Sequence, residues 1–389
     1  MTAFEAKHRP KNAAARSSAV SPIHEIIDDL QNGRMVVLVD AEDRENEGDL
    51  VIAGQMATPA AINFMARFGR GLICLALTQP RANELGLEMM VRNNASRNRT
   101  AFTQSIEARE GIATGISAHD RARTIATAID PTKGASDIVS PGHVFPLVAR
   151  EGGVLIRAGH TEASVDLAKL AGLSPSAVIC EIMNDDGTMA RMPDLVKFAS
   201  EHDLKIGTIE DLIAYRLQHD KLVEHVAETT IDTTHGGTFD LHVYTTTVNP
   251  AEHLALVKGD ISAGGPVLVR VHAVNLPGDV LGVGSAPAAA GGPLVAQAMA
   301  AIAREGRGVV VLIRDLGPKS VTDWIESQKG RGTTTMAAPV KRQVETGIGS
   351  QILRDLGVGD MILMTNSPEQ VYVGVEAFGL RIVGTRGIG

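Results

Sequence analysis

Short apolar runs alternate with longer segments of helical period along most of this chain, and that alternation limits its possible folds more than any other feature. Residues 35–40 and 71–78 are predicted as buried strands, whereas residues 58–69 and 117–129 repeat apolar side chains every three or four positions. Strands that alternate with helices favour an α/β architecture, here a mixed sheet with packed helices. A chain of 389 residues with 44% hydrophobic residues can bury more than one such core.

A change in composition after Leu217 predicts two domains. Residues 219–232 carry many charged side chains and few that could enter a core, whereas strand-forming residues return beyond them. We therefore predict a first domain at residues 21–218, a linker at 219–232 and a second domain at 233–389. Each domain is expected to have its own mixed sheet and packed helices.

The first twenty residues are rich in Ala, Ser and Arg and contain one acidic residue, Glu5. This composition could belong to a transit peptide, but it lacks the apolar core of a secretory signal. We interpret residues 1–20 as a flexible tail.

Three further segments give expectations that a structure can check. Residues 93–100 are polar and irregular, which predicts a loop that could close over a site as a lid. Residues 154–156 are predicted as a strand. The Gly- and Thr-rich residues 329–335 are predicted as a loop.

The charge and composition exclude several functions. A net charge of −8 with 3% aromatic residues argues against a nucleic-acid binder, which needs a basic face or aromatic stacking platforms. No apolar run approaches the length that crosses a bilayer, so no membrane partner is expected. Two cysteines cannot form a disulfide framework in a chain of 389 residues, which favours the reducing cytoplasm.

Residues 41–49 hold five carboxylates and one arginine between two predicted strands. Carboxylates at this density repel one another, so the segment predicts a bound cation or substrate that relieves the repulsion. A solvated acidic turn accounts for the same composition equally well when the segment is considered alone.

Three other positions carry candidate chemistry. Arg157 to Thr161 follow a predicted strand and open a helix, where free N–H groups suit an anion, although such turns also carry Gly and Thr for geometry alone. His143 follows a Ser-Pro-Gly turn and could project into a site or lie on the surface. Glu181 interrupts an apolar strand. It is either an interior carboxylate that must be paired or a residue on the outer face.

Together these segments resemble 3,4-dihydroxy-2-butanone 4-phosphate synthases from about Ser21 to Gln218. The matching motifs follow one another in order along this whole stretch, which makes the resemblance specific. They are Asp43 to Asp49, Thr100 to Thr103, Thr114 to Ser117 with Asp120 and Arg121, Ser140 to His143, Arg157 to Thr161, and Cys180 to Asn184 followed by Asp186 to Met189.

The resemblance implies a lyase that converts D-ribulose 5-phosphate into 3,4-dihydroxy-2-butanone 4-phosphate and formate. It assigns Glu45 and His160 as ligands of Mg²⁺ or Mn²⁺, the only cofactor implied. His143 and Glu181 match catalytic positions. The residues that match substrate-binding positions are Arg44, Glu45, Asp49, Arg157, Ala158, Gly159, His160, Thr161 and Glu181.

These assignments are chemically consistent. Mg²⁺ prefers carboxylate oxygens and would polarise the ketone and stabilise an enediolate after proton removal. Glu181 or a carboxylate of residues 41–49 could move protons with His143 as partner, and the sequence does not say which group takes the first proton. A metal-dependent sugar-phosphate isomerase or aldolase would use similar chemistry without releasing formate. A binding protein with a decayed site is the non-enzymatic alternative.

The resemblance also implies a homodimer with active sites near the subunit boundary, where residues 93–100 would help to close each site. Two positions depart from the common pattern of the family: Ala113 stands where a threonine is usual, and Arg99 where glycine is common. Neither is assigned to the metal or to proton transfer. Cys74 is expected to be a core residue.

From about Gly237 the chain resembles GTP cyclohydrolase II, but it lacks the zinc ligands of that family. The family holds zinc with three cysteines, the first shortly after the counterpart of His272, and here Asn275 stands in that place. No cysteine or histidine follows His272, and Asn or Ala cannot replace thiolates. We therefore predict a folded second domain without zinc and without GTP cyclohydrolase activity. A changed activity on another nucleotide is the alternative.

The motifs that survive in this half are mostly structural and include Pro266 to His272 and Gly347 to Gly349. The family's catalytic aspartate and arginine align with Arg342 and Val344, and its phosphate-binding stretch aligns with Asp315 to Lys319. We therefore expect the core of the domain to be kept and its site to be lost.

Overall fold

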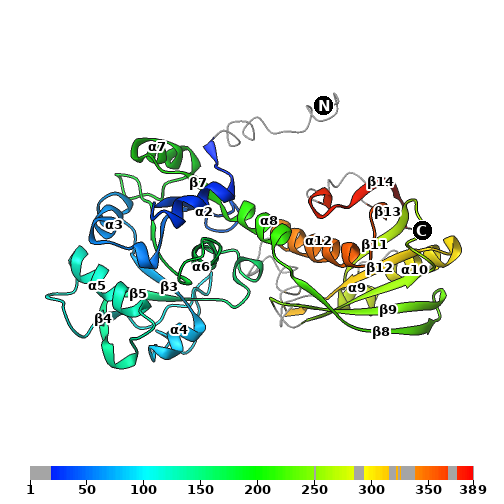
Figure 1. Ribbon diagram of the computed structural model, residues 1–389, viewed down its shortest axis with the longest axis horizontal. Coiled ribbons are helices and arrows are strands. Elements are labelled where there is room, and N and C mark those ends of the chain that lie inside the picture. Colours follow the sequence, from blue (N-terminus) through cyan, green and yellow to red (C-terminus); the bar gives the residue numbers. More distant parts are fainter. Residues whose placement is uncertain are drawn as a thin grey trace. The chain divides into compact units, whose positions relative to one another are not determined.

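The computed structural model describes residues 19–248, 251–283, 293–314, 321–322, 325, 338–366 and 375–388. The described residues form two compact units, one ending at Ile213 and the other beginning at Ala214. Each unit contains a seven-stranded mixed sheet with packed helices, which confirms the predicted fold class (Figure 1). Residues 1–18 of the predicted tail and the predicted loop at 329–335 lie outside the described residues.

The strands of the first unit are β1 (Val36–Val39), β2 (Gly48–Ala53), β3 (Cys74–Thr78), β4 (Ile106–Ala108), β5 (Ile138–Ala149), β6 (Ser176–Glu181) and β7 (Ile206–Thr208). Their order in the sheet is β4-β5-β3-β6-β2-β1-β7. β3 runs parallel to β5 and antiparallel to β6, and β2 runs antiparallel to both β6 and β1. β1, β2 and β3 are buried on both faces, which accounts for their unbroken apolar runs.

Helices cover both faces of this sheet (Figure 1). One face carries α2 (Ile23–Gln31) and α6 (His160–Leu170), and the other carries α3 (Pro59–Phe64), α5 (Ala118–Ile129) and α7 (Met192–His202). α4 (Gln79–Glu84) follows β3, and α8 (Ile209–His219) begins in the first unit and ends in the second. α5 starts at Ser117 because the Ser117 hydroxyl accepts the N–H of Asp120 at 3.0 Å.

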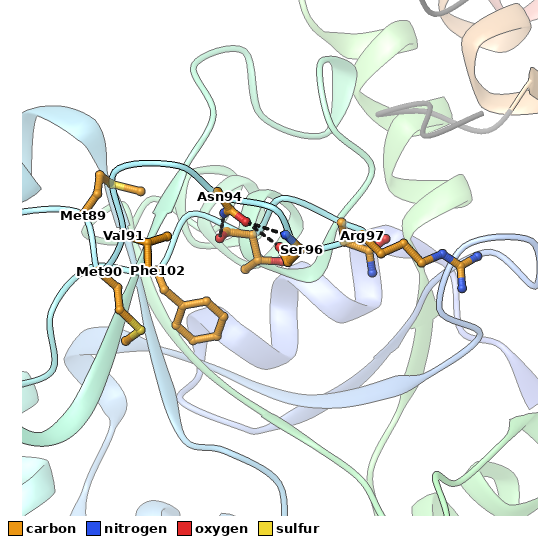
Figure 2. Close-up of a pocket in the computed structure, with 9 residues that line it drawn as sticks. Met89, Met90, Val91, Asn94, Ser96, Arg97 and Phe102 are labelled. Carbon is orange, nitrogen blue, oxygen red and sulfur yellow. Dashed lines mark hydrogen bonds between the residues drawn. The ribbon is translucent and has the colours of Figure 1, made fainter. Parts of the chain in front are cut away.

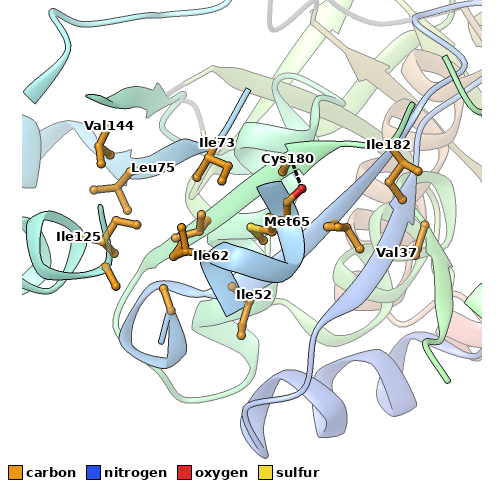
Figure 3. Close-up of a cluster of buried hydrophobic side chains, with 14 of the residues drawn as sticks. Val37, Ile52, Ile62, Met65, Ile73, Leu75, Ile125, Val144, Cys180 and Ile182 are labelled. Atoms are coloured by element: carbon orange, nitrogen blue, oxygen red, sulfur yellow. Dashed lines mark hydrogen bonds between the residues drawn. The ribbon is translucent and has the colours of Figure 1, made fainter. Parts of the chain in front are cut away.

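The larger core lies between the sheet and α3, α5 and α7 (Figure 3). Alternate strand residues such as Ile52 and Leu75 point into it and meet Ile62 of α3. Cys180 of β6 also points into this core, where its thiol donates to the carbonyl of Met65 at 3.7 Å. The next residue along β6 therefore points to the opposite face, on which α6 lies.

The strands of the second unit are β8 (Val223–Thr233), β9 (Gly237–Thr246), β10 (Glu252–Lys258), β11 (Val267–Ala273), β12 (Gly308–Ile313), β13 (Asp360–Met364) and β14 (Arg381–Arg386), in the order β14-β13-β11-β12-β10-β9-β8. Phe239 packs with α10 (Leu294–Glu305) on one face. Tyr244 points to the other face and donates to Asp355, the last residue of α12 (Ala338–Asp355), at 2.8 Å. Among the described residues, no helix is both long and apolar enough to cross a membrane.

Two predicted segments differ in the structure. Residues 219–232, predicted as a linker, contain most of β8, which pairs along its length with β9. β8 is an edge strand with mostly exposed residues, so it lacks the apolar alternation that marks a strand in a sequence. Residues 154–156, predicted as a strand, fall mainly in the short 3₁₀ helix η4 (Gly153–Leu155). The chain turns there because Gly152 and Gly153 have positive φ angles of 85° and 64°.

Candidate functional site

The ends of three adjacent strands bring carboxylates together in the first unit. Asp49 of β2 pairs with Glu181 at the end of β6 and, on its other side, with Leu38 of β1. Paired residues point to the same face of a sheet, so both carboxylates lie on the face covered by α6, whose first residue is His160. The loop from β1 to β2, residues 40–47, lies at the same end of the sheet.

His160 is buried, and its two ring nitrogens have different surroundings. Nε2 lies 3.1 Å from the carbonyl oxygen of Leu38, to which it can only donate. In the neutral ring Nδ1 is then an acceptor, and it lies 3.9 Å from Glu45 and 3.8 Å from Asp49. A histidine held in this way by a carbonyl group presents a lone pair to a metal ion.

Asp40, Glu45 and His160 each offer a ligand atom, and these atoms lie within 4.8 Å of one another. Two carboxylates and one imidazole form a donor set that fits a hard divalent cation with water at its other positions. The structure thus brings together both predicted metal ligands and adds Asp40 to them. With Asp49, these residues form what we term the acidic cluster.

The loop that carries Glu45 folds around Asp40. The Asp40 carboxylate accepts the backbone N–H groups of Glu45 at 3.1 Å and of Glu47 at 2.8 Å. Arg191, just before α7, donates to the backbone carbonyls of Glu45 and Asn46. These bonds fix the position of Glu45 without using its carboxylate oxygens.

Arg44 supplies positive charge beside the acidic cluster. Its Nη1 lies 2.7 Å from Oδ2 of Asp40 and 2.5 Å from Oε2 of Glu45. These contacts outweigh the effect of burial and raise the pKa of Arg44. One arginine cannot offset every carboxylate of the cluster, which leaves the cluster suited to a further cation.

The pKa values in the cluster reflect burial and charge in competition. Burial raises the pKa of Asp49 to about 7. The positive charge of His160 opposes this rise, and the negative charge of Glu181 adds to it. Burial by itself lowers the pKa of His160, but the nearby acids outweigh it and raise the value to about 9. Burial disfavours the charged form of Glu45, yet His160 and Arg44 lower its pKa to about 2. A cation bound here would displace the proton that these acids otherwise hold on His160.

The first turn of α6 is a second positive feature of the site. Gly159 caps the helix, so the N–H groups of residues 160–162 have no partner within it. A Cβ atom on Gly159 would lie 2.4 Å from Nη1 of Arg157 and 3.0 Å from Nη2 of Arg44, so both guanidinium groups lie against this glycine. Ala158 and Thr161 beside it are buried. Two arginines at a helix N-terminus favour an anionic group such as a phosphate.

Arg157 also joins the start of α6 to the polar loop at 93–100. Its Nη1 donates to Oε2 of Glu162 at 2.6 Å. Its Nη2 donates to the carbonyl of Asn98 at 3.1 Å and to the hydroxyl of Thr100 at 3.2 Å. These hydrogen bonds therefore hold the Arg157 side chain in one orientation.

The predicted lid, residues 93–100, contains no helix or strand and reaches the acidic cluster through Asn98, whose amide donates to Oε1 of Glu45. Asn94 shapes the loop by donating to the carbonyl of Thr100 at 2.8 Å and accepting from Ser96. These bonds (Figure 2) lie beside a hollow with a volume of about 280 Å³. The hollow is lined by Met89, Met90, Val91, Asn94, Ser96, Arg97, Asn98, Thr100 and Phe102. The loop therefore contacts one predicted metal ligand directly.

Glu181 is partly exposed at the end of β6, and its side chain reaches the chain just before β3. Its Oε2 accepts the backbone N–H of Leu72 at 2.8 Å. Gly71 permits this approach, since a Cβ atom there would lie 2.5 Å from both the carbonyl oxygen and Oε2 of Glu181. Glu181 is thus a paired carboxylate opposite Asp49, outside the apolar core.

His143 lies on β5 and is held by an acidic partner. Its Nδ1 contacts Oε1 of Glu107 on β4, and its side chain is 44% exposed. Gly115 leaves room for this pair, because a Cβ atom there would strike both Glu107 and His143. Among the described residues, no hydrogen bond or ion pair joins His143 to the acidic cluster.

His143 and Glu181 lie at the same end of the sheet, one strand apart. Phe145 and Ile179 pair with Cys74 from its two sides. His143 comes two residues before Phe145, and Glu181 comes two residues after Ile179, so β3 separates them. Two strand spacings correspond to roughly 10 Å between backbones, and among the described residues no hydrogen bond or ion pair joins the two side chains.

Sequence reasoning missed Asn98 and Arg191 as parts of the site and placed Cys74 correctly in the interior. Asn98 and Arg191 reach Glu45 from 53 and 146 residues away, and no local pattern shows such contacts. Cys74 is buried, and burial together with the charges of Glu181 and Asp49 raises the pKa of its thiol. A thiol kept neutral in this way is a poor nucleophile.

In the second unit, His272 lies near the end of β11, where the resemblance to cyclohydrolases places a zinc site. Its Nε2 lies 2.8 Å and 3.0 Å from the two carboxylate oxygens of Asp279, and its Nδ1 lies 3.3 Å from Nη2 of Arg270. Asn275 caps the short helix α9 (Leu276–Asp279). Both ring nitrogens of His272 thus have partners. The predicted stretch Asp315 to Lys319 lies outside the described residues.

The sequence of this chain matches two known protein families. The sequence matches 3,4-dihydroxy-2-butanone 4-phosphate synthase over residues 24–215 and GTP cyclohydrolase II over residues 224–387. Riboflavin biosynthesis protein RibBA of Aquifex aeolicus is 50% identical over 373 residues, which cover 93% of this chain and 90% of that protein. A 3,4-dihydroxy-2-butanone 4-phosphate synthase of Photobacterium phosphoreum is 47% identical over 369 residues, which cover 94% of this chain and 98% of that protein.

Two solved structures are similar to this fold. RibBX, a two domain 3,4-dihydroxy-2-butanone 4-phosphate synthase from A. baumannii, has a TM-score of 0.79 and 41% identity over 95% of this chain and 99% of its own. A 3,4-dihydroxy-2-butanone 4-phosphate synthase in complex with two magnesium ions has a TM-score of 0.50 and 42% identity over 51% of this chain and 98% of its own.

Proposed function

This chain belongs to the 3,4-dihydroxy-2-butanone 4-phosphate synthase family and carries a GTP cyclohydrolase II domain behind the synthase domain, and from this premise we propose how its residues act. The substrate is D-ribulose 5-phosphate, and the products are 3,4-dihydroxy-2-butanone 4-phosphate and formate. A magnesium ion is held by Glu45 and His160. The observation that supports this proposal best is the buried Nδ1 of His160, which faces Glu45 and Asp49.

The acidic cluster fits a divalent cation in donor type and charge. Asp40, Glu45 and His160 are close enough to share one ion, and the raised pKa of Asp49 reflects the buried negative charge that a cation would relieve. The similar synthase crystallised with two magnesium ions supports this choice, and Mn²⁺ suits the same oxygen-rich ligands. Bound there, the ion would polarise the carbonyl group of the substrate.

We assign the phosphate of the substrate to the first turn of α6. Arg44 and Arg157 lie against Gly159 there, beside the free N–H groups of residues 160–162. Arg157 also contacts the loop at 93–100. A phosphate bound at this turn would therefore bring the loop and the acidic cluster into one closed site.

Glu181 and His143 are the residues assigned to proton transfer. Glu181 lies opposite Asp49 and is partly exposed, so it can exchange a proton with a substrate beside the cluster. Glu107 holds Nδ1 of His143, which leaves Nε2 as the atom that gives or takes a proton. Glu107 therefore positions the imidazole rather than reacting itself.

The active form is proposed to be a homodimer with its sites near the subunit boundary. His143 lies about two strand spacings from Glu181 within one chain, roughly 10 Å, so a second copy could complete the set of proton-transfer groups. Met89, Met90 and Val91, beside the loop at 93–100, are large apolar residues that are between 45% and 52% exposed. Apolar exposure of this kind suits an interface. Sedimentation that showed a fully active monomer would contradict the dimer.

The second domain is proposed to lack GTP cyclohydrolase II activity and that family's tightly bound zinc. No cysteine follows Cys180 in the chain, and Asp279 and Arg270 occupy both nitrogens of His272. Tetrahedral zinc cannot be held by the asparagine and alanine that remain. Two relatives that cover more than 90% of this chain carry names that mention the synthase alone, which also supports the proposal.

One experiment tests both parts of the proposal. The purified chain is incubated with ribulose 5-phosphate and Mg²⁺, or separately with GTP, and formate is measured in each reaction. We expect formate from the sugar phosphate, abolished by a chelator, and none from GTP. Consumption of the sugar phosphate without formate would support an isomerase or aldolase instead. Formate from GTP that disappears when the chain ends at Leu217 would contradict the inactivity of the second domain.

A further inference from the structure

Two histidines and a glutamate meet on the edge of the second sheet. His225 and Glu228 lie on the edge strand β8, and His242 lies on its neighbour β9. One ligand atom from each residue lies within 4.8 Å of the other two. This group lies well away from His272, because β10 and β12 separate β9 from β11, a distance of roughly 14 Å.

A β-bulge makes this arrangement possible. Residues three apart on a regular strand point to opposite faces, which would separate His225 from Glu228. In the structure Val226 is an extra residue, so that His225 pairs with Tyr244 and Glu228 pairs with His242. Tyr244 and His242 are two residues apart and share a face. The bulge therefore places all three candidate ligands on that same face.

The distances match those between the ligands of one metal ion. Nε2 of His225 lies 3.3 Å from Nδ1 of His242. The same Nδ1 lies 3.6 Å from Oε2 of Glu228. Ligand atoms bound about 2.0–2.1 Å from a tetrahedral zinc ion are about 3.3–3.4 Å from one another. The three side chains thus need little rearrangement to surround an ion.

We propose that His225, Glu228 and His242 form a binding site for a borderline divalent cation such as Zn²⁺, with water completing the coordination. Two imidazoles and one carboxylate favour zinc over magnesium, which prefers oxygen ligands alone. The Glu228 side chain is 69% exposed, so the bound ion exchanges with the solvent. While bound, the ion links the edge strand β8 to β9.

This site differs from the zinc site of GTP cyclohydrolase II in residues and in expected behaviour. The cyclohydrolase ligands are thiolates that would follow His272, and the chain has none there. The three residues of the present site all precede His272. An open site with three protein ligands takes up added zinc but loses it to a chelator.

The test uses the full-length chain after chelator treatment, with excess Mg²⁺ to fill the acidic cluster, and Zn²⁺ alone as the titrant in a calorimeter. The wild-type chain should bind one more Zn²⁺ than the double variant His225→Ala/His242→Ala. Glu228→Gln should weaken this binding by about tenfold or more, since even residues that only support a metal ligand contribute that much. The matched control is His235→Ala, which removes an exposed histidine from the turn between the same two strands and should bind as the wild type does.

A second readout excludes loss of folding as the cause. Circular dichroism and formate production should be unchanged in all of these variants. In ¹⁵N spectra of the wild-type imidazoles, the signals of His225 and His242 should shift together with added Zn²⁺ while that of His235 stays in place. Equal zinc binding by the wild type and the double variant, or unshifted signals from His225 and His242, would overturn the proposal.

Discussion

Each unit contains a buried histidine among charged residues, His160 in the first and His272 in the second. The surroundings of the two rings differ. His160 donates from Nε2 to a backbone carbonyl, and its Nδ1 faces the carboxylates of Glu45 and Asp49 at distances near 4 Å. His272 has both nitrogens in close contact, with Asp279 on one side and Arg270 on the other.

Both rings are buried, so the difference lies in the partners of their nitrogens rather than in their burial. A carbonyl on one nitrogen orients the ring and directs the other nitrogen at the acids, where a bound cation would take the place of its proton. A carboxylate and a guanidinium on the two nitrogens leave neither free. In the second unit, the absence of cysteines after Cys180 thus coincides with a histidine whose two ring nitrogens have partners within the fold.

Removing a ligand of the acidic cluster is the strongest test of this comparison. Glu45→Gln and His160→Ala should each lower turnover by about three orders of magnitude or more, because the metal is lost. His272→Ala is the matched control in the second unit and should leave formate production close to the wild-type rate. Formate release and Mn²⁺ binding would be measured for all three variants. Wild-type turnover and metal affinity in either cluster variant would break the comparison.

Glu181→Gln tests whether Glu181 transfers a proton in the first site. Glutamine is nearly isosteric with glutamate and can still contact the N–H of Leu72, but it cannot exchange a proton. We expect kcat to fall by about two orders of magnitude, the range of general acid–base groups, with little change in KM. Steady-state kinetics with ribulose 5-phosphate would measure both constants. A near-normal kcat would make Glu181 a structural residue only.

The pKa of His253 in the second unit is shifted in the opposite direction to that of His160. Burial and the nearby charge of Arg314 lower the pKa of His253 to about 4, and its Nδ1 accepts the N–H of Arg314 at 3.1 Å. Among the described residues, no group bonds to its buried Nε2. Above pH 6.5, the usual histidine pKa, the ring is neutral in both the folded and the unfolded chain and does not affect stability.

Below that pH only the unfolded chain takes up the proton, so stability is lost as the pH falls toward 4. The contribution of His253 should decrease by about 2 kcal/mol between pH 7 and pH 5. Hydrogen exchange of the β10 and β12 amides would follow this loss. His253→Asn should flatten the pH dependence, and an unchanged slope in that variant would assign it to other groups.

Truncation after Leu217 is expected to have the smallest effect on chemistry. The acidic cluster, the start of α6, Glu181 and His143 all precede this residue, so the shortened chain should still release formate from ribulose 5-phosphate. Leu217 packs against Gly347, and loss of that contact should lower solubility or alter assembly. Elemental analysis of the chelator-washed full chain should find no stoichiometric zinc. Zinc retained in the full chain and absent from the truncated one would contradict the inactive second domain.

The sequence allowed the fold class to be predicted because it depends on local pattern. The linked motifs pointed to Glu45 and His160 as metal ligands, and the structure places these two residues close together. Apolar runs and helical periods showed the sheet and its helices, and the crowded carboxylates of residues 41–49 indicated a cation. Alternation along β6 could not tell which face Glu181 occupies, since that depends on where α6 packs. β8 was missed because an edge strand exposes both faces and keeps no apolar pattern.

Contacts between residues far apart in the chain could not be predicted from the sequence. Asn98 and Arg191 are polar residues in irregular segments, and nothing near them in the chain shows that they contact Glu45. The pairing of His225 with Tyr244 depends on a one-residue bulge that propensities do not show. Contacts of this kind become visible only when the register between strands is known.

Gly71 carries a consequence for how this enzyme can vary. It has no side chain and takes no part in the reaction, yet a single added methyl group would collide with both the backbone and the carboxylate of Glu181. An alanine at this position would have to push the end of β6 away from the chain before β3, and Glu181 would move away from Asp49 with it. Position 71 should therefore tolerate substitution as poorly as an active-site residue, and an inactivating change could arise there in a chain whose metal ligands and catalytic groups are all intact.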